Sequence, residues 1–143
     1  MDAKRYFGLA LVVVTLALVA GLTFLGRDHQ TRVFTVDFRQ GHTLSDDSDV
    51  AIARIATLMS RQPRYQAVVV GHSGTRGDDS ANLELSRERA AVVSRQLIDD
   101  GIDEDRIDVH GLGGDDPLPR GDDEGERRYQ QRLARVEVEL NYR

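Results

Sequence analysis

The feature that most constrains the fold is a strand-like run that leads through a glycine-containing loop into a long amphipathic segment. Ala67–Val70 is short, apolar and rich in β-branched residues, which is typical of a central strand. After the loop, apolar positions recur with helical spacing up to about Asp99. Arg89 and Asn82 both fall inside the apolar arc of this helix. The sequence therefore predicts a strand–loop–helix unit with one charged and one amide side chain turned toward the interior.

Two interpretations of Arg89 follow from this position. A buried guanidinium needs partners because an unpaired buried charge is costly, and a structural carboxylate or the carbonyl groups at strand ends would serve. Alternatively, the guanidinium binds the carboxylate of a ligand, because its forked donors match that group. Asn82 adds a donor and an acceptor nearby. The periodicity does not choose between these interpretations.

Strand and helix patterns alternate on both sides of this unit. Alternation of apolar and polar residues predicts strands at 33–38, 106–110 and 136–140. Helical spacing predicts a helix that starts near residues 45–48 and ends before Pro63, and a short helix at 127–133. The acidic stretch 115–126 is expected to be a solvated loop. The order β-α-β-α-β-(α)-β predicts a two-layer α/β (α+β) sandwich, a small mixed sheet with helices on one face.

The N-terminal segment is long and apolar. Residues 6–26 contain no Asp, Glu, His, Lys or Arg, and at ~1.5 Å per residue they can cross a hydrocarbon core of ~30 Å. Lys4 and Arg5 favour a cytoplasmic N-terminus. The alternative is a signal peptide that is cleaved after Ala20. The expected organisation is a cytoplasmic N-terminus at 1–5, a transmembrane signal anchor at 6–26, a short linker at 27–32 and a folded domain at 33–143.

The composition excludes several classes of function. The net charge of −5 offers no basic surface for nucleic acid. The absence of cysteine excludes disulfides and thiolate sites, and the four histidines lack the spacing of metal ligands, so we expect neither a metal nor a cofactor. The loop Gly71–Gly74 resembles the turn around a hydrolase nucleophile, but Thr75 stands where that motif needs glycine. A hydrolase that uses Ser73 is therefore the weakest hypothesis, and we expect no catalysis.

Residues 68–93 resemble the signature of the OmpA-like (OmpA/MotB) cell-wall-binding domain. Val68–Gly71 followed by His72 matches the strand–loop opening of that signature. The resemblance covers roughly residues 33–140. The helix matches the pattern N-x-x-L-S-x-x-R-A at every fixed position, through Asn82, Leu85, Ser86, Arg89 and Ala90.

The resemblance implies a non-catalytic protein of the bacterial cell envelope that binds the diaminopimelate of a peptidoglycan stem peptide. Arg89 would hold the carboxylate, and Arg135 keeps one of the two arginines of the N-R-R-V run of the family. With the anchor, the protein would be a single-pass inner-membrane protein whose C-terminal domain lies in the periplasm; after cleavage it would be soluble in the periplasm. The expected binding residues are Arg89, Asn82, Leu85, His72, Ser73, Gly74 and Arg135.

One position departs from the family pattern, because Gly74 stands where the family has a loop aspartate. No carboxylate at this position can pair with the ammonium group of the ligand. Asp78 and Asp79 are candidates to replace it, although residues of this type also cap helix N-termini. The second hypothesis is therefore a membrane-anchored scaffold or interaction domain that has lost or altered peptidoglycan binding and has other envelope proteins as partners.

Overall fold

The computed structural model describes residues 31–143. The transmembrane segment predicted at residues 6–26 lies outside the described residues, as does the N-terminus before it. Between residues 31 and 143, no helix is long and apolar enough to cross a membrane. These residues include all of the domain expected at 33–143.

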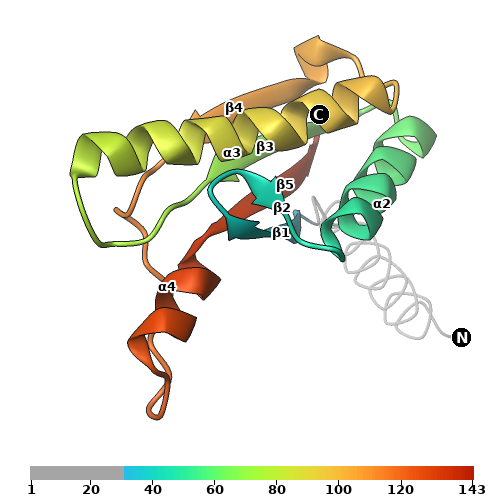
Figure 1. Ribbon diagram of the computed structural model, residues 1–143. Coiled ribbons are helices and arrows are strands. Elements are labelled where there is room, and N and C mark those ends of the chain that lie inside the picture. Colours follow the sequence, from blue (N-terminus) through green and yellow to red (C-terminus); the bar gives the residue numbers. More distant parts are fainter. Residues whose placement is uncertain (1–30) are drawn as a thin grey trace, which may run out of the picture.

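The described part of the chain contains five strands and three α-helices (Figure 1), and their order along the chain is the predicted one. Two short elements, β2 and the 3₁₀ helix η1, were not predicted, because two or three residues carry no period. The elements are β1 (Arg32–Gln40), β2 (Thr43–Leu44), α2 (Ser48–Arg61), β3 (Tyr65–Gly71), α3 (Asp79–Asp99), η1 (Glu104–Arg106), β4 (Ile107–Gly111), α4 (Glu126–Leu133) and β5 (Arg135–Tyr142).

The strands form one mixed sheet with the order β2-β1-β5-β3-β4. Strands β3 and β4 are parallel, and the other neighbours are antiparallel. Parallel neighbours need a long crossover, which α3 supplies. The chain enters α3 from the end of β3 and leaves α4 directly into β5, so both connections meet at one end of the sheet.

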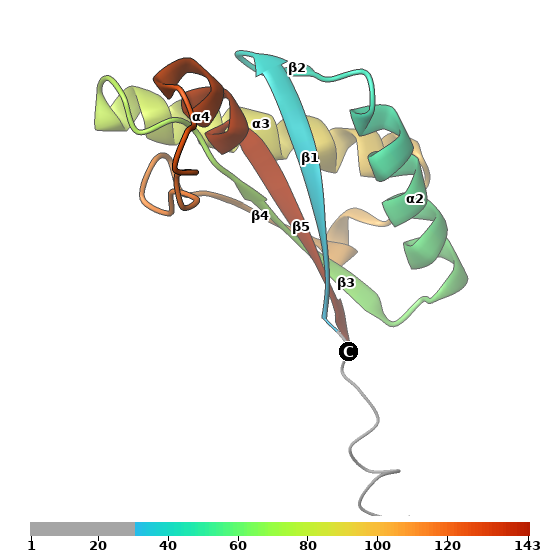
Figure 2. The same ribbon diagram turned by 90° about the horizontal axis from the view of Figure 1, so that it is seen from below.

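The core lies on one face of the sheet. Alternate strand residues point to opposite faces, and on the inner face Val36 pairs with Val136 and Val69 with Val138. All four are fully buried, which contributes about 1.5–3 kcal/mol for each side chain relative to exposure. Helices α2 and α3 cover this face, whereas α4 sits at the end of the sheet where β5 begins (Figures 1 and 2). The predicted arrangement of helices on one face is confirmed for α2 and α3.

Helix α3 approaches β3 closely at Gly71, where the strand ends and the loop to α3 begins. A Cβ atom added at Gly71 would lie 1.9 Å from the carbonyl oxygen of Ser86, so only glycine fits between strand and helix. The helix starts with Asp78 as N-cap, whose side chain accepts from the Ala81 N–H at 2.9 Å. It ends before Gly101, which has a φ of 88°.

Candidate functional site

The loop that joins β3 to α3 contains three of the expected binding residues, His72, Ser73 and Gly74, and is held by its backbone. His72 N donates to the carbonyl oxygen of Arg135 at 2.9 Å, and Ser73 N donates to that of Gly113 at 2.8 Å. Gly113 N in turn donates to the hydroxyl of Ser86 on α3 at 2.9 Å. The loop is therefore fixed between the start of β5, the segment after β4, and α3.

Arg89 is buried and binds two carbonyl groups. Its Nε donates to Gly41 O at 2.7 Å and its Nη1 to His72 O at 2.9 Å. The guanidinium lies over the ring of Phe38, with 5.5 Å between Cζ and the ring centroid. Burial lowers the pKa of Arg89. Arg89 thus binds backbone carbonyl groups, which is the first of the two interpretations that the sequence allowed. Its Nη2 group has no hydrogen-bond partner among the described residues.

Asn82 lines a cavity to which Arg89 does not contribute. The cavity has a volume of about 270 Å³ and lies at the start of α3, where Thr75, Asp79 and Asp115 also line it. The side-chain amide of Asn82 donates to the carbonyl oxygen of Arg76 at 3.1 Å. The structure therefore does not bring Asn82 and Arg89 together in one cavity, although both belong to the same helix. Leu85, one turn along, is half-buried.

Asp78 and Asp79, the two candidates to replace the loop aspartate, have different surroundings in the structure. Asp78 accepts hydrogen bonds from the Ser80 hydroxyl and from the Ala81 N–H, and these bonds lower its pKa. The side chain of Asp78 thus serves as the N-cap of α3. Asp79 instead lines the cavity with Asn82.

His72 and Arg135 form a buried polar cluster on the sheet face opposite the core. Arg135 Nε donates to Glu137 Oε1 at 2.7 Å, and its Nη2 lies 3.9 Å from a carboxylate oxygen of Asp116. Arg135 Nη1 and both ring nitrogens of His72 are buried and have no hydrogen-bond partner among the described residues. Burial lowers the pKa of His72, and the nearby guanidinium of Arg135 lowers it further. The cluster therefore favours a neutral imidazole.

Ser73 makes a local bond. Its hydroxyl donates to the carbonyl oxygen of Gly74 at 3.0 Å, not to an imidazole. Between residues 31 and 143 there is no group of three His, Asp or Glu side chains that could hold a metal ion.

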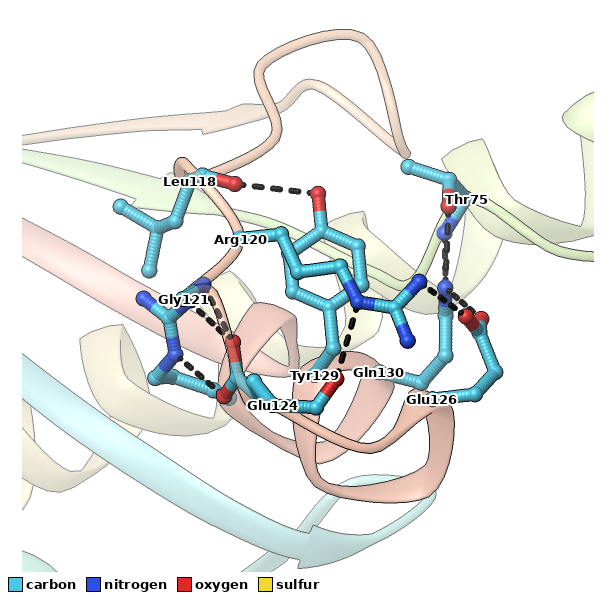
Figure 3. A network of polar contacts seen from close by, with 9 residues as sticks. Thr75, Leu118, Arg120, Gly121, Glu124, Glu126, Tyr129 and Gln130 are labelled. Atoms are coloured by element: carbon cyan, nitrogen blue, oxygen red, sulfur yellow. Dashed lines mark hydrogen bonds and ion pairs between the residues drawn. The ribbon is translucent and has the colours of Figure 1, made fainter.

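Gln130 on α4 is a residue that the sequence did not indicate. Its Oε1 accepts from Thr75 N at 3.0 Å, and its Nε2 donates to Thr75 Oγ1 at 3.0 Å (Figure 3). A Cβ atom added at Gly74 would lie 2.3 Å from Gln130 Oε1. The only signal of this contact in the sequence is the glycine at position 74. A glycine shows that a side chain is missing but not which residue lies next to it.

Polar contacts hold α4 and the loop before it (Figure 3). The acidic stretch is an exposed loop, as predicted, but three of its carboxylates, those of Asp116, Glu124 and Glu126, form ion pairs with arginines. Hydrogen bonds from Arg132 hold the pKa of Glu124 down to about 2. The other contacts are the ion pair of Arg120 with Glu126 and the hydrogen bond from Tyr129 to the Leu118 carbonyl oxygen.

The sequence is similar to one protein family and to several curated proteins. Residues 38–132 match the model of the OmpA family. The probable lipoprotein YiaD of Escherichia coli K12 is 30% identical over 99 residues, which cover 69% of this chain and 44% of that protein. This chain spans less than half the length of the curated relatives it matches.

Two solved structures have similar folds. One is the peptidoglycan-associated lipoprotein from Burkholderia pseudomallei, with a TM-score of 0.67, 22% identity, and coverage of 76% of this chain and 90% of that chain. The other is the periplasmic domain of Helicobacter pylori MotB, with a TM-score of 0.62, 20% identity, and coverage of 81% of this chain and 79% of that chain. At these identities the likeness shows the fold alone.

Proposed function

This chain belongs to the OmpA family, and from that premise we propose that its domain binds peptidoglycan non-covalently and without catalysis. The observation that carries the proposal is the loop–helix unit after β3, where a fixed polar loop borders a cavity lined by Asn82. A similarly folded protein is described as a peptidoglycan-associated lipoprotein. The ligand that fits this chemistry is a stem peptide with diaminopimelate, which offers carboxylate and ammonium groups.

The proposed roles follow from charge and position. Arg89 has an Nη2 group without a partner among the described residues, and it is proposed to bind a carboxylate of the ligand outside the cavity that Asn82 lines. The donors of the His72–Arg135 cluster lie on the other face of the sheet and are proposed only as a second place for a carboxylate. Asp79 is proposed to receive the ammonium group, because its carboxylate lines the cavity while that of Asp78 is used for capping. The walls of the cavity are formed by Leu83, Leu112 and Gly113, and the backbone of Ser73 holds Gly113 in place.

A pull-down with purified sacculi tests this function. We expect the wild type to be retained, and Asp79→Asn and Arg89→Ala to reduce retention. Asp99→Asn, an exposed carboxylate at the other end of α3, is the matched control and should be retained like the wild type. Retention that neither Asp79→Asn nor Arg89→Ala changes would contradict the proposed site, and no retention of the wild type would contradict the function.

The second candidate function is that of a scaffold or interaction domain in the envelope. Two observations favour it: Gly74 brings no carboxylate to the loop, and Arg89 already binds two carbonyl oxygens within the domain. A scaffold would leave sacculi unbound and would be recovered with specific envelope proteins after chemical cross-linking in cells. Retention on sacculi would reject this alternative as the main function.

We further propose that residues 6–26 anchor the protein in the inner membrane, with the domain in the periplasm. Their apolar composition supports an anchor. The linker of six residues reaches only ~20 Å when extended, so an anchored domain would meet peptidoglycan only where the wall and the membrane are close. N-terminal sequencing of the mature protein is the test. A start near Gly21 would contradict the anchor and support a soluble periplasmic form.

A further inference from the structure

Gly74 faces the end of the Gln130 side chain. The 2.3 Å that would separate a Cβ atom at Gly74 from Gln130 Oε1 is shorter than any real contact of this kind. Gly74 does not have the positive φ that favours glycine, so its backbone would accept a side chain. The side-chain position of residue 74 is therefore occupied by the end of the Gln130 side chain, which would have to move to admit a Cβ atom.

Three hydrogen bonds fix the carboxamide of Gln130 (Figure 3). Two of them join it to Thr75, and in the third its Nε2 donates to Glu126 Oε1 at 2.9 Å. Arg120 donates to the other oxygen of Glu126 at 2.9 Å, so the carboxylate that orients Gln130 is itself held. Both N–H groups of the amide are used, and the oxygen keeps one free lone pair. Gln130 thus presents a fixed and uncharged group to the loop.

Thr75 links this contact to the cavity, because it binds Gln130 and also lines the cavity with Asp79. We propose that Gln130 is a positioning residue of the binding site: it fills the side-chain position of residue 74 and holds Thr75 at the mouth of the cavity. A ligand's ammonium group then meets Asp79 and not the loop. This inference rests on the proposed function.

The distribution of charge supports this assignment. An ammonium group that leaves water needs a carboxylate to offset its desolvation, and a neutral amide does so poorly. Near Gly74 the carboxylate of Glu126 is already paired with Arg120. Asp79 and Asp115 both line the cavity that Thr75 borders, so this cavity offers the carboxylates. The loop side of the site is therefore selective for uncharged groups, and the cavity side for the amine.

The test measures binding of the full-length protein to a soluble stem peptide with diaminopimelate, whose side-chain amine is either free or acetylated. Gln130→Ala removes two hydrogen bonds to Thr75, and we expect about tenfold weaker binding of the free-amine peptide. Gly74→Asp alone should also weaken binding, because the new side chain displaces the end of Gln130 and breaks its hydrogen bonds to Thr75. Gly74→Asp combined with Gln130→Ala should restore the affinity, because the carboxylate then has room. The double variant should also prefer the free amine more strongly than the wild type does.

Gln131→Ala is the matched control, since Gln131 is an exposed neighbour on α4, and it should bind like the wild type. Circular dichroism checks folding, and Gln130→Met, which keeps the side-chain length without the hydrogen bonds, replaces Gln130→Ala if that variant is unfolded. Unchanged affinity in the Gln130 variant would overturn the inference. Equal affinities of the Gly74→Asp single variant and the double variant Gly74→Asp with Gln130→Ala would also overturn it. A wild type that binds neither peptide nor sacculi would overturn the proposed function before any variant is compared.

Discussion

The guanidinium of Arg89 is enclosed by groups that carry no negative charge. Two carbonyl oxygens, from Gly41 and His72, accept its hydrogen bonds, and Phe38 lies under its plane. Hydrogen bonds that involve a charged donor are stronger than neutral ones, so they offset part of the desolvation. Arg89 thereby ties the turn after β1 to the loop after β3.

We expect Arg89→Ala to lower the free energy of unfolding by about 2–3 kcal/mol, because two carbonyl groups lose their donors and Phe38 loses its cover. Arg89→Lys should recover part of the loss, since an ammonium group can still reach a carbonyl oxygen. Urea denaturation followed by circular dichroism measures the difference. Arg95→Ala, on the exposed side of the same helix, is the control. A loss no larger than that of the control would mean that these bonds contribute little.

His72 makes stability depend on pH. Its side chain is 2% exposed, and burial, followed by the charge of Arg135, lowers its pKa below the ordinary 6.5, against the opposite effect of Glu137 and Asp116. The unfolded chain therefore binds the proton first as the pH falls, and stability is lost below about pH 6.5. We expect the melting temperature to fall between about pH 7.5 and 5.5.

The control for this pH dependence is a pair of histidine variants. His72→Gln should show a smaller fall in melting temperature than the wild type, whereas His42→Gln, at an exposed position, should show the same fall. Equal pH slopes for the wild type and His72→Gln would contradict the assignment to His72.

At the scale of the elements, β3 and α3 meet through backbone atoms at Gly71. Because Ser86 lies within α3, its carbonyl cannot yield without moving the helix, and we expect Gly71→Ala to cost about 3 kcal/mol. Gly125→Ala is the control, since its φ is −63° and nothing lies within 4 Å of the added atom. Thermal denaturation compares the two variants. Equal melting temperatures would contradict the close contact.

The segment before α4 depends on Glu124, which accepts from Arg132 Nε at 3.0 Å and Nη2 at 2.8 Å. These bonds lower its pKa from 4.5 to about 2. A lowered folded-state pKa contributes stability in full above pH 4.5, and this contribution is lost as the pH falls toward 2. We expect the Tyr129 ring signals in NMR spectra to report loosening of α4 over that range. The same response in Glu124→Gln would assign it to another group.

At the scale of the whole molecule, one core joins β1, α2, β3, α3 and β5. Helix α4 contributes only Leu133 to the buried residues, so polar contacts hold the rest of it. We expect its amides to exchange with solvent by local opening, faster than those of β5. Hydrogen exchange followed by NMR measures this, and Gln130→Ala should speed exchange in α4 while leaving β5 unchanged. Equal protection of α4 and β5 would contradict this picture.

Much of the fold was predictable because local pattern reflects which side of an element meets the core. Alternation at 33–38 and 136–140 predicted β1 and β5, and helical spacing predicted α2 and α3. The neighbours within the sheet, with β5 between β1 and β3, were not predictable in the same way. That order depends on contacts between distant segments, which no local period describes.

The sequence by itself determined the family, the strand–loop–helix unit and the inward position of Arg89, because these depend on residue type and on spacing along the chain. Only the tertiary structure decided what Arg89 and Gly74 meet. The partner of Arg89 at Gly41 lies 48 positions away, and Gln130 lies 55 positions from the Thr75 that it binds. The position of a residue along a helix determines the side of the helix on which its side chain lies. The residues that this side chain contacts depend on how the helices and strands pack against each other.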